Sequence, residues 1–99
     1  MSDSEEQMDY AAELASAVRY VRHDTSKSPL KLKENFDVIF RHIGNAIKVG
    51  GDKIDPSYPT SHDLLMAIEE VYMTLDTDET DDQVAAEFIF AILNKICVR

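Results

Sequence analysis

The sequence predicts an all-α fold, a small helical bundle with three core helices and an N-terminal helix. Along four segments, apolar residues recur three or four positions apart, which is the spacing of one helix face. Serine or threonine stands at the start of each segment, where helix N-caps occur, and the three prolines lie at a helix start or between segments. With 99 residues, 44% of them hydrophobic, we expect one helical domain over residues 1–99.

The first helix is predicted over residues 4–23. Ser4 and Gln7 have the spacing of a capping box, in which each side chain binds the backbone N–H of the other residue. The apolar positions that follow at helical spacing are Met8, Ala11, Leu14, Ala15, Val18 and Val21. Because this stripe is rich in alanine, we expect the first helix to bury the least surface and to detach most easily.

The second helix is predicted over residues 29–49, because Pro29 suits the first position of a helix and Gly50-Gly51 suits its end. One face of this segment is apolar, with Leu32, Phe36, Ile39, Phe40, Ile43 and Ile47. The connection that follows, residues 50–60, contains two prolines and is long for a helical bundle.

The third helix is predicted over residues 61–75 and the fourth over residues 81–97. Thr60 or Ser61 caps the third, and Asp63 in its first turn complements the helix dipole. In the fourth, the run FIFAIL by itself would also suit a buried strand. Glu87, Asn94 and Lys95 fall at polar positions of a helix, so we predict a helix there.

The charge is unevenly distributed. The formal net charge is −9, and residues 56–99 carry nine acids against only two bases, Lys95 and Arg99. Nucleic acids and anionic lipid surfaces are bound through clustered cations, so we predict no direct nucleic acid binding and no membrane binding. The single cysteine, Cys97, excludes an internal disulfide, and the acidic N-terminal residues do not resemble a secretory signal. We therefore expect a cytoplasmic protein.

The acidic segment LDTDETDDQVAAEF, residues 75–88, allows two interpretations. As a calcium-binding EF-hand loop over residues 76–87, it would offer Asp76, Asp78, Thr80 and Glu87 as ligands. The sixth position of that loop requires glycine and is occupied here by Asp81. The loop is thus a poor match to the calcium motif.

The second interpretation is a capped helix start. Thr80 and Gln83 have the spacing of a capping box, and Asp81 and Asp82 would complement the helix dipole in the first turn. A helix that begins at residue 80 or 81 could not wrap around a cation. We favour the helix start and retain calcium binding as an alternative.

The carboxylates of this half of the chain have no lysine or arginine between Lys53 and Lys95 to neutralise them. Such surfaces often serve only solubility, but a cationic partner would relieve the repulsion and be attracted faster. We predict a non-catalytic interaction or regulatory protein (a connector, inhibitor or immunity protein) that binds a basic protein surface. A nucleic-acid mimic that blocks a DNA-binding protein is the alternative. The predicted partner-binding residues are Glu69, Glu70, Asp76, Asp78, Glu79, Asp81 and Asp82.

No pattern in the sequence is typical of catalysis. His23, His42 and His62 share no metal-ligand spacing, no nucleophile motif surrounds a serine or the cysteine, and Gly50-Gly51 follows a helix instead of opening one. We predict that the protein is not an enzyme and uses no metal or cofactor.

The fourth predicted helix is apolar over most of its circumference. Phe90 and Cys97 are seven residues apart, so on a continuous helix they would share one side, which Leu93 adjoins. Either the first helix covers this side, or a second copy of the chain does, since two-fold dimers are the commonest oligomers. We predict a homodimer through Phe90, Leu93 and Cys97.

From Phe40 to Ile96 the chain resembles the small enterobacterial connector proteins of the biofilm and acid-resistance regulator family (the AriR type). The residues that carry the resemblance are Ile43, Ile47, Gly51-Asp52-Lys53-Ile54, Ile68, Tyr72, Val84, Phe88 and Ile92. The resemblance implies a helix that ends in a Gly-Asp turn, followed by a helical hairpin. It also implies a non-enzymatic helical dimer that acts on signalling proteins in stress or biofilm control.

Overall fold

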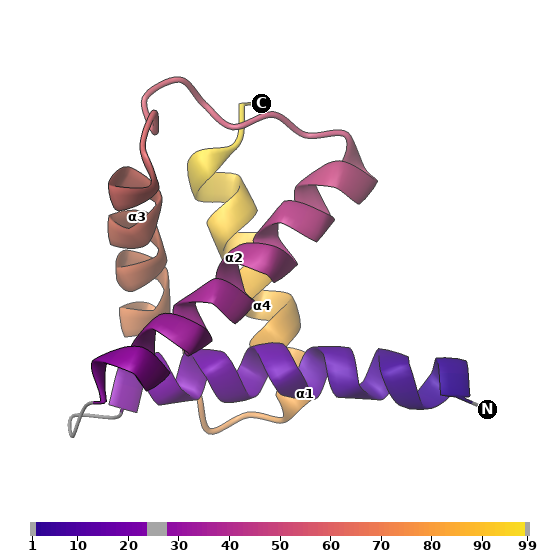
Figure 1. The fold of residues 1–99 in the computed structure, drawn as a ribbon. Helices are drawn as coiled ribbons and strands as arrows, with labels where there is room; N and C mark the ends of the chain where they lie inside the picture. The colour runs from indigo at the N-terminus through magenta and orange to yellow at the C-terminus, as the bar shows by residue number, and fades with distance from the viewer. Residues whose placement is uncertain (1, 24–27, 99) are drawn as a thin grey trace.

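The computed structural model describes residues 2–23 and 28–98, with side chains from Tyr10 onward. It contains four helices: α1 (Ser2–His23), α2 (Pro29–Gly50), α3 (Ser61–Thr74) and α4 (Asp81–Ile96). Figure 1 shows α1 crossing beneath the other three helices, with α2 rising obliquely and α3 and α4 running upright. Within those two ranges there are helices and no strand, which confirms the all-α prediction.

The helix starts follow the local signals in the sequence. The Ser28 hydroxyl accepts a hydrogen bond from the Lys31 backbone N–H at 3.3 Å, and Pro29 occupies the first turn of α2. Thr60 and Thr80 each form a complete capping box, with Asp63 and Gln83 respectively. α1 begins at Ser2, two residues before the predicted start, and the side chains of the predicted Ser4–Gln7 capping box lie outside the described part.

α2 ends at Gly50, as Gly50-Gly51 in the sequence predicted. Gly51 has a φ of 71°, in the left-handed region that an L-residue with a Cβ seldom adopts, and its N–H donates to the carbonyl of Ile47. The chain then crosses to α3 over the top of the molecule in Figure 1.

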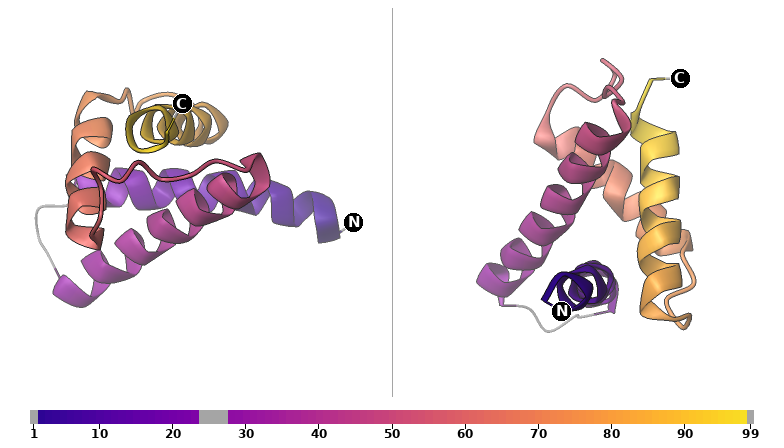
Figure 2. Two further views of the ribbon diagram at one scale, coloured as in Figure 1. Left: turned by 90° about the horizontal axis from the view of Figure 1, so that it is seen from above. Right: turned by 90° about the vertical axis from the view of Figure 1, so that its right-hand side faces the viewer.

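Two helices, α1 and α4, form the centre of the fold, since each of them packs against all three others. Figure 2 shows α1 end-on, lying between α2 on one side and α4 on the other. The fully buried large side chains come from every helix, with Phe88 and Ile92 of α4 at the centre together with Val18, Ile39 and Ile68. The hydrophobic cores of small domains are built in this way, from one apolar face of each helix.

The prediction that α1 buries the least is wrong, which removes the reason for expecting it to detach most easily. Its buried residues are Leu14, Ala15, Ala17, Val18 and Val21, whereas α2 buries only Ile39, His42 and Ile43. The alanines do not make α1 a thin cover. Its small side chains lie within the core, and α1 contacts all three of the other helices. α1 is therefore one of the core helices.

The connection between α2 and α3 is attached to the C-terminal end of the chain. Ile54 and Cys97 form an isolated antiparallel bridge, in which Asp55 N–H donates to the Ile96 carbonyl at 2.7 Å and Val98 N–H donates to the Lys53 carbonyl at 2.8 Å. The long connection is thus held at its middle by two backbone hydrogen bonds.

Candidate functional site

The turn between α3 and α4, residues 75–80, receives two arginines from α1. The Arg19 guanidinium donates to the carbonyl of Thr77 at 3.0 Å and to the carbonyl of Glu79 at 2.7 Å, and it also pairs with the Asp81 carboxylate. One side chain thereby binds both sides of the turn and the first residue of α4. A guanidinium suits this role because its donors lie in a planar, rigid fork.

Arg22 and His23 lie beside Arg19 at the end of α1. Arg22 donates to the carbonyls of Tyr72, at 2.8 Å, and Leu75, which belong to the last turn of α3 and its cap. The Tyr72 carbonyl also accepts the Leu75 N–H of the helix cap at 3.4 Å, and a cation at this end of α3 is favoured by the helix dipole. The His23 imidazole forms a hydrogen bond with the Thr77 hydroxyl at 2.8 Å. The acidic turn is therefore held in place by the basic end of α1.

These contacts correct the premise that the acidic segment has no cation to relieve it. Asp81 is paired with Arg19, and Glu70 is paired with Lys95 of α4 at 2.7 Å. The sequence reasoning searched for cations nearby in the chain, and Arg19 lies 62 residues away from Asp81. Of the seven predicted partner-binding residues, Asp81 and Glu70 are therefore occupied by ion pairs inside the molecule.

Within residues 10–23 and 28–98, the other acids of the turn have no such pair. Asp76, Asp78 and Asp82 are exposed, and the Asp76 carboxylate accepts a hydrogen bond from the Asp78 backbone N–H at 3.0 Å. Glu87 of α4, which was not among the predicted residues, comes near enough to Glu79 to raise its pKa. The nearby Glu87 charge is the largest cause of that rise, followed by partial burial and by the charge of Asp76. The Glu79 carboxylate is thus repelled by the charges of Asp76 and Glu87 at this end of the molecule.

The alternative of an EF-hand over residues 76–87 is wrong. α4 begins at Asp81, with Thr80 as its N-cap: the Thr80 hydroxyl accepts from Gln83 N–H at 3.3 Å, and the Gln83 side chain accepts from Thr80 N–H at 3.4 Å. Residues 81–87 are helical and cannot enclose an ion. In the described ranges no group of three or more His, Cys, Asp or Glu side chains is arranged to hold a metal.

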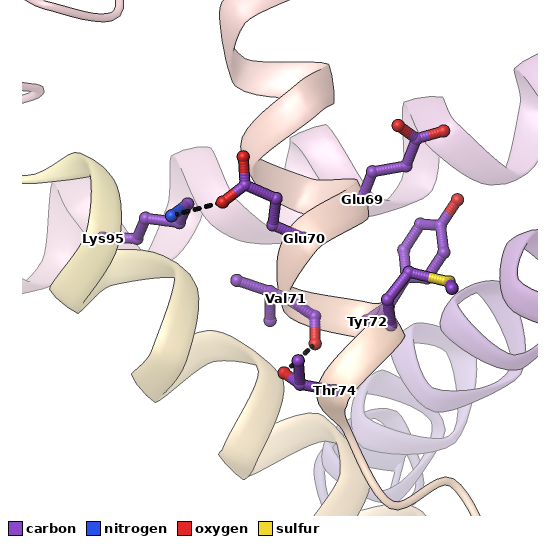
Figure 3. A pocket seen from close by; sticks show the side chains of 7 residues that line it. Glu69, Glu70, Val71, Tyr72, Thr74 and Lys95 are labelled. Atoms are coloured by element: carbon purple, nitrogen blue, oxygen red, sulfur yellow. Dashed lines mark hydrogen bonds and ion pairs between the residues drawn. The ribbon is translucent and has the colours of Figure 1, made fainter.

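Beside the turn, the outer side of α3 carries a hollow of about 750 Å³. Figure 3 shows Glu70 reaching Lys95 of α4 on one flank of α3, above Val71 and Thr74, with Glu69 and Tyr72 on the other flank. Met73 also lines it and is 62% exposed. Val71 and Tyr72 turn towards the core, and Glu69 has no ion pair within the described residues. The hollow is thus apolar at its base and acidic at its edge.

The predicted dimer residues do not form one patch. Phe90 is 71% exposed, so α1 does not cover it, and Leu93 is half-buried. Cys97 is 8% exposed and belongs to the core. The expectation that Phe90 and Cys97 share one side is wrong, because α4 ends at Ile96 and Cys97 has an extended backbone that pairs with Ile54. Burial also raises the pKa of the Cys97 thiol, which disfavours the reactive thiolate.

A second polar cluster joins α1 to α2. His42 is the one buried polar residue among the described side chains. Its Nε2 lies 2.8 Å from the Glu13 carboxylate. Arg41 donates to the same carboxylate at 2.7 Å, and the ring of Tyr10 packs on the His42 imidazole with centroids 4.4 Å apart. These bonds hold the pKa of Glu13 below its ordinary value, with the His42 hydrogen bond as the largest cause. The cluster therefore joins α1 to α2 through one shared carboxylate.

The residues that sequence reasoning missed are mostly basic. Arg19, Arg22 and Lys95 act on acids or carbonyls of other helices, and no local pattern marks such pairs. One usable signal was present for Arg22 and His23: two basic residues in the last turn of a predicted helix. That signal indicates a helix end but not the distant carbonyls that Arg22 binds.

No family model matches the chain, and no curated protein or solved structure matches it significantly. The resemblance to the AriR type of connector therefore stays a prediction. Among the described residues, no helix is both long and apolar enough to cross a bilayer.

Proposed function

We propose that this protein is a non-catalytic binding protein that recognises a basic protein surface through the acidic end formed by the α3–α4 turn and the start of α4. The surface comprises Glu69, Asp76, Asp78, Glu79, Asp82 and Glu87. It is the predicted acidic surface without the two internally paired residues, and with Glu87 added. Regulation of another protein, as a connector or an inhibitor, is the role we infer for such binding.

The single observation that supports the proposal most is the position of Glu79. The charge of Glu87, partial burial and the charge of Asp76 raise the pKa of its carboxylate, although Arg19 donates to the Glu79 carbonyl. The Arg19 donors are engaged by two carbonyls and by Asp81. A cluster of like charges destabilises a fold, and a cationic partner would remove that repulsion and associate faster.

The experiment compares two triple variants of equal charge. The first, Asp76→Asn/Glu79→Gln/Glu87→Gln, removes the repelling cluster. The control, Glu34→Gln/Asp37→Asn/Asp52→Asn, removes three exposed acids of α2 and the following connection. Each protein is immobilised and exposed to extract of its native cells at low and high salt, and the captured proteins are identified.

We expect the wild type and the control to capture the same basic partner, the cluster variant to lose it, and high salt to release it. Equal capture by both variants would contradict the proposal. If DNA competes with the captured partner, the role is that of a nucleic-acid mimic; connectors and inhibitors predict no competition.

A further inference from the structure

The exposed face of α3 has the pattern of a surface that receives another helix. Met66 and Met73 are seven residues apart, which is two turns of helix, so they lie on the same side. They are 49% and 62% exposed. Glu69 and Glu70 fall on either side of this line of methionines. Two exposed methionines between two glutamates make the face apolar along its centre and anionic along its margins.

We propose that this methionine face, with the hollow at its lower end, is the docking site for a basic amphipathic helix of the partner. The inference rests on the proposed function and adds the kind of segment that is recognised. Apolar side chains of that helix contact Met66 and Met73, and lysines or arginines beside them reach Glu69 and the acids of the turn. Helices that dock in this way present apolar residues at positions i, i+3 or i+4, and i+7.

Methionine suits the centre of such a face. Its unbranched, polarisable side chain adapts to apolar partners of different shape, and methionine is enriched at protein interfaces. The base of the hollow is supplied by Val71 and Tyr72, which α3 already buries against the core, so the site is supported by rigid packing.

The acidic residues around the methionine face indicate which kind of helix binds there. Glu70 is neutralised by Lys95, whereas Glu69 has no ion pair within the described residues, and the hollow lies at the end of α3 that leads into the acidic turn. An acidic or neutral helix would leave these charges desolvated without a partner. A second copy of this chain would bring the same acidic margins against this face, so electrostatics oppose self-association there. A cationic helix satisfies both the apolar centre and the acidic margins.

The test uses two synthetic peptides of about 18 residues made of leucine and lysine. One has leucines at helical spacing, so that they form one face. The other has the same composition in an order that mixes leucine and lysine around the helix. Titration calorimetry at physiological salt measures their binding to the wild type, to Asp76→Asn/Glu79→Gln/Glu87→Gln, to Met66→Gln/Met73→Gln, and to Leu30→Gln/Val49→Gln. The last variant is the matched control, because Leu30 and Val49 are exposed apolar residues of α2.

We expect the amphipathic peptide to bind at least tenfold tighter than the mixed one to the wild type and to the control, and the methionine variant to lose that preference. If both peptides bind equally and only the Asp76/Glu79/Glu87 variant weakens them, the docking inference is wrong and the proposed anionic function stands. If neither peptide binds, both fail. If the methionine variant instead converts a dimer into a monomer in sedimentation, the occupant is a second copy and the inference is overturned.

Discussion

His42 illustrates at the scale of one residue how a polar group is kept inside this fold. An imidazole that is 8% exposed needs a hydrogen-bond partner, because an unpaired polar group costs about 1–3 kcal/mol when buried. Glu13 of α1 provides that partner, and Arg41 holds the carboxylate from the side. The contact therefore links the position of α1 to that of α2.

The contact between Glu13 and His42 stabilises the fold less at low pH. The pKa of Glu13 is lowered in the folded protein from 4.5, first by the His42 hydrogen bond. A lowered pKa means that the ionised carboxylate stabilises the fold above about pH 4.5, and that this contribution is lost as the pH falls through the folded pKa. We expect Glu13→Gln to lower the free energy of unfolding at pH 7 by about 1 kcal/mol or less, because solvent screens a carboxylate that is 44% exposed.

Urea unfolding between pH 3 and pH 7 measures this effect. The difference between wild type and Glu13→Gln should shrink towards pH 3, whereas Glu34→Gln, on an exposed part of α2, should leave the curve unchanged. A difference that is the same at every pH would show that the loss comes from packing and not from the charge.

At the scale of the element, the four helices differ in what determines them. The starts of α2, α3 and α4 depend on Ser28, Thr60 and Thr80, whose side chains act within three residues of their own position. Such contacts are predictable from the sequence, because the groups are held close together by the chain. The contribution of α1 to the core does not follow from a local signal, because it depends on the contacts of α1 with the three other helices.

We predict that α1 is required for cooperative folding. Leu14 is 2% exposed and belongs to the core, so Leu14→Ala should lower the free energy of unfolding by about 2–5 kcal/mol through lost burial and the cavity that remains. Leu30→Ala removes the same atoms from a residue that is 67% exposed, so it should lower the free energy of unfolding by much less. Thermal unfolding followed by circular dichroism compares the two variants. A small and equal loss for both would restore the view of α1 as a detachable helix.

At the scale of the whole molecule, one large apolar side chain of α4 remains exposed on the face away from the core. Phe90 is 71% exposed, and Leu93 beside it is half-buried. We retain the homodimer as a prediction, now through Phe90 and Leu93 and without Cys97, because a two-fold partner would bury an exposed aromatic ring. Cys97 is buried within its own chain, so we expect no disulfide between the two copies.

Sedimentation velocity at tens of micromolar tests the dimer. We expect a species of twice the 11.2 kDa chain mass, and Phe90→Glu should dissociate it, because an unpaired charge in such a contact costs several kcal/mol. Leu30→Glu adds the same charge to an exposed residue of α2 and should leave the dimer intact. A single species of 11.2 kDa for the wild type would refute the dimer.

The sequence by itself determined the features that arise from short-range physics. Helical spacing gave the four helices, the Thr80–Gln83 capping box placed the start of α4, and Gly51 placed the end of α2. The Thr80 cap also favoured a helix start over a calcium loop, and the structure shows α4 beginning at Asp81. These interactions join residues three or four apart, so their geometry follows from the helix itself.

Only the tertiary structure decided which charges and apolar groups remain available. Arg19 reaches Asp81 across 62 residues of chain, Lys95 pairs with Glu70, and Cys97 leaves the helix to pair with Ile54. Such contacts depend on the angles at which the helices pack, and those angles result from the fit of many side chains at once. The acidic composition was therefore readable from the sequence, whereas the repelling cluster of Asp76, Glu79 and Glu87 required the packed molecule.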